Sequence, residues 1–294
     1  MTVKIGSLFS GIGGLDLACE RVFGGDTVWQ VEQEPYCQRV LESRWPNAQR
    51  HSDVRKVGAH NLEPIDVLCG GFPCQDLSHA GLRKGLDGHK SGLYSELLRI
   101  TAELNPRYVA IENVPALVYY RDRVYRDFES LGYGMLWQEC QASDAGAPHR
   151  RRRVFVLAVR GMGRSVSLNR PAQRKLPNPW PTPTVKGNYN KAGLSKKSGD
   201  GLATAAGGCL NPAWVETLMG FPAGWTDPSA RTGSHAWPMA RGDEQAPHEP
   251  PRLVSPRSTP HRKERLKALG NAVVPQQGIL ALQRAKEASN DDVA

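Results

Sequence analysis

Short apolar segments rich in β-branched residues alternate with segments of helical periodicity over the first 160 residues, and this alternation limits the folds open to the chain. Such alternation is typical of a mostly parallel sheet flanked by helices. We therefore predict an α/β fold, in which ligands bind beyond the carboxyl ends of the strands. The predicted strands are 3–9, 27–32, 67–72, 108–112 and 153–159. The predicted helices are 14–22, 35–44, 93–103, 124–131 and 276–288.

The texture of the sequence changes after residue 160. Residues 161–209 have little periodicity and carry eight lysines and arginines against one acid, Asp200, which suits a surface that faces phosphates. A compact apolar motif at 210–222 precedes a second irregular segment, 223–262, with many prolines. We predict a catalytic and cofactor-binding domain at 1–160, completed by 270–294, and a small domain at 161–269.

Composition indicates a cytoplasmic protein with a polyanionic partner. The formal net charge of +9 favours nucleic acid as that partner, although many basic enzymes bind none. No apolar run has the length of a membrane span, and the N-terminal residues lack the features of a secretion signal. The six cysteines show neither a disulfide framework nor the paired spacing of zinc sites, so we expect reduced thiols and no metal.

A glycine-rich loop at residues 9–14 links the first predicted strand to the first predicted helix. Glycines there permit a tight turn and a close approach of ligand to backbone. Glu32 ends the second strand about 20 residues later, where an acid can bind ribose hydroxyls. Asp53 can accept from an adenine amino group. A tight turn without a ligand is the alternative, but the acid that follows favours an adenosine-bearing cofactor.

The apolar run 67–72 ends in Pro73, Cys74 and Gln75. A thiol at the end of a buried strand, at the mouth of a glycine-rich loop, can meet substrate. A buried structural cysteine is the alternative and the commoner fate of free cysteines. This stretch alone does not decide between the two.

Two further strand ends carry charged residues. Glu112, followed by Asn113, ends the predicted strand 108–112, and its carboxyl would reach the same cleft as Cys74. Arg151 and Arg153 precede or begin the next strand, where alternate residues share a face and could bind phosphate or a developing anion. The alternatives are a surface acid next to a turn, and a solvated basic run.

These motifs occur in the order found in DNA cytosine-5 methyltransferases, and the chain resembles the compact bacterial or phage type. The resemblance covers about residues 1–160 and 208–290. It implies a Rossmann-like S-adenosylmethionine-dependent methyltransferase sheet with a small irregular target-recognition domain. The motifs that carry it are 9–14, 73–75, 112–114, the arginine pair 151 and 153, 215–222 and 270–273.

The resemblance implies catalytic roles for Cys74, Gln75, Glu112, Arg151 and Arg153. The Cys74 thiolate would attack carbon 6 of a cytosine turned out of the duplex, and carbon 5 would take the methyl group of S-adenosylmethionine. Glu112 would donate a hydrogen bond to ring nitrogen 3, which requires a protonated carboxyl. Its pKa must then rise from about 4.3 toward neutrality, and burial beside apolar residues is a plausible cause.

The resemblance also implies which residues meet the cofactor and the DNA. Residues 75–92 resemble a loop that closes over the flipped base, with Gly81, Gly85, Gly88 and Gly92 as hinges. The implied cofactor-binding residues are Phe9, Ser10, Gly11, Gly13, Gly14, Glu32, Gln33, Asp53, Val54, Pro73, Asn271 and Ala272. The expected phosphate contacts are Ser78, Lys90, Lys186, Lys191, Lys196 and Lys197, and Asn188, Tyr189 and Asn190 are candidates to reach base edges.

The chain departs from the family pattern at two positions. His149 stands where the family usually has glutamine, which leaves the role of that side chain in doubt. Gln33 stands where an aromatic residue often stacks on adenine, which could weaken cofactor affinity. Neither position carries the bond-making chemistry.

Three functions compete at this point. The first is DNA methylation, in a restriction-modification pair or by a solitary phage or host enzyme, acting as a monomer on double-stranded DNA. The second is methylation of transfer RNA on the same scaffold, which residues 115–118 argue against because they lack the Cys-Phe-Thr element typical of that group. The third is a DNA-binding module without activity, which has no need of Cys74, Glu112 and Arg153.

Overall fold

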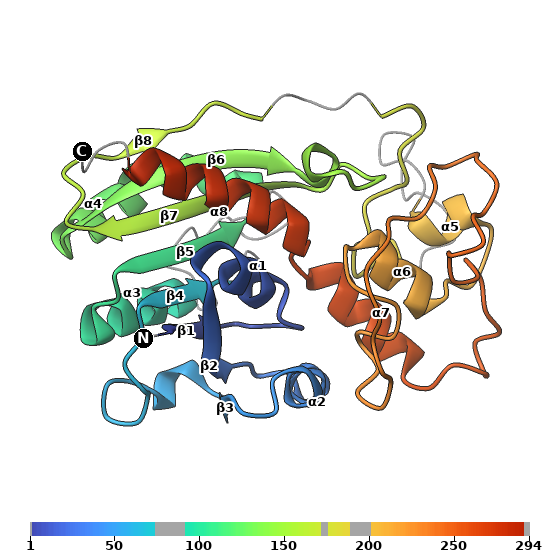
Figure 1. Ribbon diagram of the computed structural model, residues 1–294, viewed down its shortest axis with the longest axis horizontal. Coiled ribbons are helices and arrows are strands. Elements are labelled where there is room, and N and C mark those ends of the chain that lie inside the picture. The colour runs from blue at the N-terminus through green and yellow to red at the C-terminus, as the bar shows by residue number, and fades with distance from the viewer. Residues whose placement is uncertain (1, 74–91, 172–175, 189–200, 291–294) are drawn as a thin grey trace.

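One eight-stranded sheet forms the centre of the computed structural model, which describes residues 2–73, 92–171, 176–188 and 201–290 (Figure 1). The strands lie in the order β3-β2-β1-β4-β5-β7-β6-β8. Their bounds are β1 Val3–Leu8, β2 Gly25–Val31, β3 Gln49–His51, β4 Val67–Gly70, β5 Tyr108–Asn113, β6 Tyr133–Gln141, β7 Arg152–Arg160 and β8 Val166–Ser167.

The first five strands in the chain run parallel to one another. β1 pairs with β2 and β4, β2 pairs with β3, and β4 pairs with β5. β7 pairs antiparallel with both β5 and β6. The predicted α/β fold is confirmed, and the five predicted strands correspond to β1, β2, β4, β5 and β7. The sequence analysis did not predict β3, β6 or β8.

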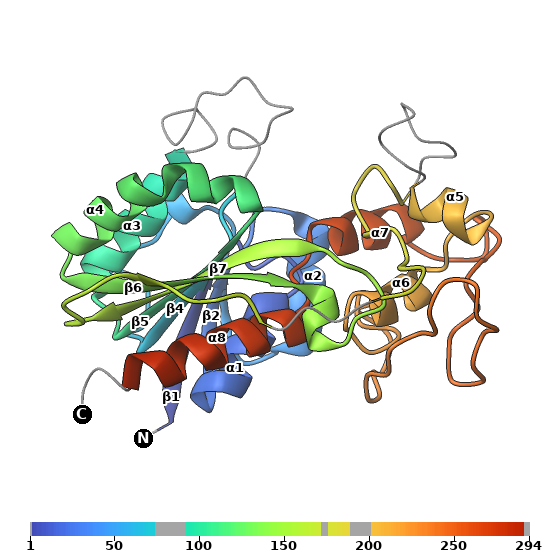
Figure 2. The same cartoon turned by 90° about the horizontal axis from the view of Figure 1, so that it is seen from above.

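Helices cover both faces of the sheet (Figure 2). α1 and α8 pack against each other on one face, and α3 and α4 lie on the other. The five predicted helices correspond to α1 to α4 and α8, whereas α5, α6 and α7 were not predicted. The bounds are α1 Gly14–Phe23, α2 Pro35–Arg44, α3 Gly92–Leu104, α4 Arg121–Ser130, α5 Leu202–Ala206, α6 Pro212–Leu218, α7 Arg262–Asn271 and α8 Pro275–Asn290.

Burial on both faces explains the continuous apolar run of β5. Val109 and Ile111 pack into the core on the side of α3 and α4, and Ala110 packs into the core on the side of α1 and α8. Strands of a sheet covered on both sides have no solvent face and therefore lose the apolar–polar alternation. The apolar run stops at Glu112 and Asn113, at the carboxyl end of β5.

α1 carries an acid into the core. Asp16 is fully buried, and its two carboxylate oxygens accept hydrogen bonds from the Gln30 amide at 2.8 Å and the Ser7 hydroxyl at 3.0 Å. Burial raises the pKa of Asp16 to about 7, and these two hydrogen bonds oppose the rise. The native carboxyl therefore holds its proton at a pH where the unfolded chain has released it.

Replacing Asp16 with asparagine is expected to remove a pH dependence of stability. In the native protein the raised pKa makes stability fall as pH rises from about 4 to about 7, because only the native state still binds the proton. Between pH 5 and pH 7 the wild type should lose about 2 kcal/mol more than the variant in urea unfolding. Asp26→Asn, which changes an exposed acid, is the control. Equal losses in wild type and Asp16→Asn would contradict the prediction.

The described residues between 180 and 274 pack around a core that also includes one face of α2. Trp180, Trp214 and Trp225 form this core with apolar residues of α6 and α7, and Tyr36 and Cys37 of α2 belong to it. Residues 223–261 contain neither helix nor strand, as expected for the second irregular segment. The predicted boundary at 269/270 falls inside α7, and the division into two domains stays a prediction. No helix among the described residues is long and apolar enough to cross a membrane.

Buried charges connect α2, α6 and α7 to the irregular segment. The Glu216 carboxylate is fully buried and accepts from the Arg265 guanidinium at 2.8 Å and from the Thr226 backbone N–H at 3.0 Å. Arg44 of α2 donates to a row of backbone carbonyls in the same region. The side chains of Arg44 in α2 and Glu216 in α6 thus supply partners for backbone that forms no regular structure. The carbonyls that Arg44 contacts belong to Gly224, Trp225, Asp227 and Ala230.

Candidate active site

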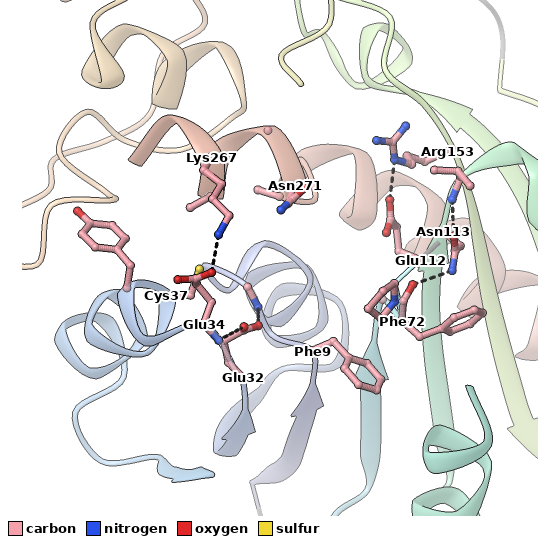
Figure 3. A pocket seen from close by; sticks show the side chains of 18 of the residues that line it. Phe9, Glu32, Glu34, Cys37, Phe72, Glu112, Asn113, Arg153, Lys267 and Asn271 are labelled. Carbon is pink, nitrogen blue, oxygen red and sulfur yellow. Dashed lines mark hydrogen bonds and ion pairs between the residues drawn. The ribbon is translucent and has the colours of Figure 1, made fainter. Parts of the chain in front are cut away.

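The carboxyl ends of the parallel strands surround a cavity of about 380 Å³ (Figure 3). The residues that follow β1, β2 and β4 line it, together with the end of β5 and the last turns of α7. This is the edge at which open parallel sheets bind ligands. Its lining includes the predicted site residues Phe9, Gly11, Glu32, Pro73, Glu112, Arg151, Arg153, Asn271 and Ala272.

The glycine-rich loop needs its glycines for backbone shape and for close packing. Gly11 and Gly13 have φ angles of 57° and 82°, which favour glycine over other residues, and Phe9 adopts a φ of 56° without being one. A Cβ on Gly14 would lie 2.3 Å from the Val273 carbonyl oxygen, so only glycine lets α1 approach the segment before α8. Gly13 packs against the Trp45 ring in the same way.

A small cavity of about 50 Å³ lies under this loop. Ser10, Gly11 and Gly14 line it from one side, and Asn271 and Ala272 line it from the other. The sequence analysis expected all five residues to contact the cofactor, and the structure brings them together. The Ser10 hydroxyl is largely buried and donates to the Ser7 carbonyl at 3.3 Å.

Glu32 joins the glycine-rich loop to the end of β2. Its two carboxylate oxygens accept hydrogen bonds from the backbone N–H groups of Gly11 and Glu34, each at 2.7 Å. Burial raises the pKa of Glu32, and these two hydrogen bonds counteract the rise. The carboxylate still lines the cavity, where its remaining lone pairs can accept from hydroxyl groups.

A third cavity, of about 140 Å³, continues the cleft past Glu32. Phe9, Glu32 and Pro73 line both this cavity and the large one, so the two are neighbours along one cleft. The predicted cofactor residues Gln33, Asp53 and Val54 line it as well, and Arg55 and Leu93 complete the wall. Of the predicted cofactor-binding residues, only Gly13 lines none of the three cavities.

Glu112 and Arg153 form an ion pair at the other end of the cleft. Their Oε1 and Nε atoms are 2.9 Å apart, and the side chains are 12% and 18% exposed. Burial raises the pKa of Glu112, and the positive charges of Arg153 and Arg151 oppose that rise. The carboxyl can therefore act as a proton donor closer to neutral pH than an ordinary glutamate.

Asn113 holds the backbone that leads toward position 74. Its side-chain amide donates to the Phe72 carbonyl at 3.0 Å, and the side chain is almost fully buried. The contact ties the end of β5 to the segment after β4, so Glu112 and Pro73 line the same cavity. Cys74 and Gln75 follow directly but lie outside the described residues.

The expected strand geometry of the arginine pair is wrong. β7 begins at Arg152, and Arg151 precedes it with a φ of 30°, so the two arginines do not alternate along one strand. Both line the large cavity, but they differ in their contacts. The buried Arg151 guanidinium donates to the carbonyls of Pro183 at 2.8 Å and Ala272 at 2.6 Å. Arg151 thus fixes the backbone around Asn271.

The expected DNA contacts have mixed outcomes. Lys186 is exposed, which fits a phosphate contact. Asn188 is fully buried and donates to the Leu266 carbonyl at 3.0 Å, so the expectation that it reaches a base edge is wrong. Its polar side chain instead joins the turn at 185–188 to α7. The other expected residues, Ser78, Lys90, Tyr189, Asn190, Lys191, Lys196 and Lys197, lie outside the described residues, as do the expected hinges Gly81, Gly85 and Gly88.

Gly92, the last expected hinge, is the first residue of α3. His149, whose role the sequence left open, is fully buried, and its Nε2 lies 2.8 Å from the Leu218 carbonyl oxygen. Burial lowers the pKa of His149 to about 3, so the ring is neutral and links the segment before β7 to α6.

The sequence analysis missed an ion pair in the wall of the large cavity. Lys267 of α7 and Glu34 at the start of α2 both line the cavity, and their Nζ and Oε2 atoms are 2.6 Å apart (Figure 3). Cys37 lines the same wall. The sequence did not indicate a role for Lys267, because α7 was not predicted. Glu34 could have been noticed, because it directly precedes Pro35, which begins α2.

Comparison with known proteins connects this cleft to a family. The model of the C-5 cytosine-specific DNA methylase family matches residues 3–200. The type II methyltransferase M.Bsp6I of a Bacillus species is 34% identical over 205 residues, which cover 67% of this chain and 62% of that protein. The type II methyltransferase M.CviJI of a Paramecium bursaria chlorella virus is 35% identical over 54% of this chain and 44% of its own length. The matches thus span less than two thirds of these relatives.

Solved structures share this fold over 96% or more of the chain. Spodoptera frugiperda DNMT2 has a TM-score of 0.63 at 16% identity, with 96% of this chain and 99% of that chain covered. The Entamoeba histolytica methyltransferase EhMeth has a TM-score of 0.64 at 16% identity, with coverage of 100% and 99%.

Proposed function

Because the chain belongs to the C-5 cytosine-specific DNA methylase family, we propose that it transfers a methyl group from S-adenosylmethionine to carbon 5 of cytosine in a specific DNA sequence. The observation that most supports this is the placement of Glu112. It is a largely buried carboxyl with a raised pKa, held by Arg153, in the same cavity as Glu32 and Pro73. A proton donor and a set of adenosine-binding groups thus share one cleft.

The cleft has the donors and acceptors that S-adenosylmethionine requires. Glu32 offers a carboxylate to the ribose hydroxyls, and Asp53 offers one to the adenine amino group. The residues around the small cavity, with Asn271, would hold the methionine end. When bound, S-adenosylmethionine supplies an electrophilic methyl group.

The chain's own residues would activate the cytosine. The Cys74 thiolate adds to carbon 6, and the electron pair of the 5,6 double bond moves toward carbon 5. Glu112 donates a proton or a hydrogen bond to ring nitrogen 3, which stabilises the negative charge that addition of the thiolate places on the ring. After methylation, the proton on carbon 5 passes to water, and departure of the thiolate from carbon 6 restores the double bond. Arg153 keeps Glu112 in place, and burial raises the pKa of Glu112, which favours the protonated form.

Transfer of labelled methyl groups tests this proposal. Purified protein is incubated with labelled S-adenosylmethionine and either double-stranded DNA or transfer RNA. We expect label in DNA as 5-methylcytosine and none in RNA. Label in RNA alone would assign the cleft to the competing RNA reaction, and label in neither would favour a binding module without activity.

The basic segment 161–209 is the proposed DNA surface. Replacing Lys196 and Lys197 with alanine is expected to reduce the salt dependence of DNA binding, because each lost phosphate contact removes about 0.9 from the slope of log K against log salt. The slope is measured by fluorescence anisotropy on a labelled duplex from 50 to 200 mM salt. Lys56→Ala, which removes an exposed cation that follows β3, is the control. A slope equal to that of the wild type would place the DNA surface elsewhere.

The biological setting is also a proposal. The relatives are type II methyltransferases, which supports a role in DNA modification beside a cognate nuclease, or as a solitary enzyme of a phage or its host. We propose that the protein acts as a monomer in the cytoplasm. Bisulfite sequencing of DNA from cells that express the chain would identify the modified sequence.

A further inference from the structure

Arg55 forms a bidentate (two-pronged) contact with the carboxylate of Asp53 at the far end of the cleft. The Arg55 Nε lies 2.9 Å from Asp53 Oδ1, and one terminal nitrogen of the guanidinium lies 3.1 Å from Oδ2. The Arg55 backbone N–H also donates to Oδ1 at 3.1 Å. A two-pronged arginine–carboxylate contact fixes the plane of the carboxylate as well as its position.

Both members of this contact line the cavity of about 140 Å³. Arg55 is the only lysine or arginine among the described residues that form its wall. The Asp53 side chain is 25% exposed and the Arg55 side chain 65% exposed, so the contact lies at the rim of the cavity. A simple surface ion pair contributes little to stability, and the value of this one lies in its geometry.

Asp53 stays ionised in this arrangement. The hydrogen bonds from the Arg55 side chain and backbone lower the pKa of Asp53. An ionised carboxylate accepts hydrogen bonds and donates none. It therefore attracts an amino group on a ligand and repels a carbonyl oxygen in the same place. The difference in affinity between an amino group and a carbonyl oxygen grows when the Asp53 carboxylate cannot rotate away from the ligand.

We propose that Arg55 is a specificity-determining positioning residue, which orients Asp53 so that the cleft selects a 6-aminopurine ring over a 6-oxopurine ring. The inference rests on the proposed function, because it takes the cavity to hold the adenine of S-adenosylmethionine. Arg55 lies outside the sequence motifs that carry the resemblance to the family, so the inference assigns a role to a residue that those motifs do not include. It also explains how the cleft recognises adenine although Gln33 has no aromatic ring to stack on it.

Calorimetric binding of two product analogues tests the proposal. S-adenosylhomocysteine carries an amino group at purine position 6, and S-inosylhomocysteine carries an oxygen there. The wild type should bind the adenosyl compound at least about tenfold more tightly, which corresponds to about 1.4 kcal/mol. Arg55→Ala should reduce this ratio to less than about threefold, mainly through weaker binding of the adenosyl compound.

Arg55→Lys separates geometry from charge. Lysine keeps the positive charge but cannot form the two-pronged contact, so its ratio should fall as in Arg55→Ala. Lys56→Ala removes a neighbouring charge without touching the contact and should keep the wild-type ratio. Equal melting temperatures for all variants show that folding is intact.

The possible failures are distinguishable. A wild-type ratio in Arg55→Ala or in Arg55→Lys would overturn the role of Arg55 and leave the proposed function standing. Failure of the wild type to bind either compound would overturn the proposed function of the cleft itself.

Discussion

Replacement of Glu112 with glutamine should lower the single-turnover rate of methyl transfer by about 10²- to 10⁴-fold. Glutamine keeps the shape and can still form hydrogen bonds, but it cannot transfer a proton to ring nitrogen 3. Affinity for S-adenosylmethionine should be nearly unchanged, because the cofactor residues of the glycine-rich loop and Glu32 are untouched. The rate is measured by rapid quench with labelled cofactor and a saturating duplex.

The pH profile gives a second readout for Glu112. Because burial raises its pKa and the protonated form is the active one, the wild-type rate should fall as pH rises through that value. The glutamine variant should lack this fall. Glu129→Gln, which alters an exposed acid on α4, is the control for the substitution itself. A wild-type rate in Glu112→Gln would remove the proton donor from the mechanism.

Replacement of Arg265 with methionine should destabilise the protein by about 3–5 kcal/mol. The Arg265 side chain is only 7% exposed, and without it the fully buried Glu216 carboxylate loses its partner at 2.8 Å. Urea unfolding measures the effect. Lys263→Met, at an exposed position of the same helix, is the matched control and should stay within about 0.5 kcal/mol of the wild type.

The double variant Glu216→Gln, Arg265→Met tests the reason for that loss. If an uncompensated buried charge causes the damage, neutralising Glu216 should recover part of the stability. The Glu216 carboxylate also accepts the backbone N–H of Gly224 on Oε2 and that of Thr226 on Oε1, and the single oxygen of glutamine can keep only one of these two hydrogen bonds, so the recovery should be incomplete. A double variant no more stable than Arg265→Met would assign the loss to packing instead.

Most of the sheet could be predicted because its elements carry strong local patterns. β5 is an unbroken apolar run with both faces buried, and α2 begins at a proline and ends where predicted. β6 escaped prediction because buried polar residues, such as Gln138, interrupt its apolar pattern. α7 escaped because its outward surface is dense in charge, and its apolar residues Leu266 and Leu269 pack against partners from other parts of the chain.

The residues of the candidate site likewise divide into those that a local pattern predicts and those whose role depends on distant parts of the chain. Residues at strand ends, such as Glu32 and Glu112, could be placed from the sequence because parallel strands bring their carboxyl ends to one edge. The role of Arg151 could not, because it depends on carbonyls at positions 183 and 272, distant in sequence. Asn188 was misassigned for a related reason: nothing local indicates that α7 would bury it.

The packing of α8 has a consequence for how the small cavity is assembled. α8 packs on α1, and Asn271 and Ala272 close the small cavity under the glycine-rich loop. The two walls of that cavity come from segments far apart in the sequence, so the cavity is complete only when α8 has docked on the sheet.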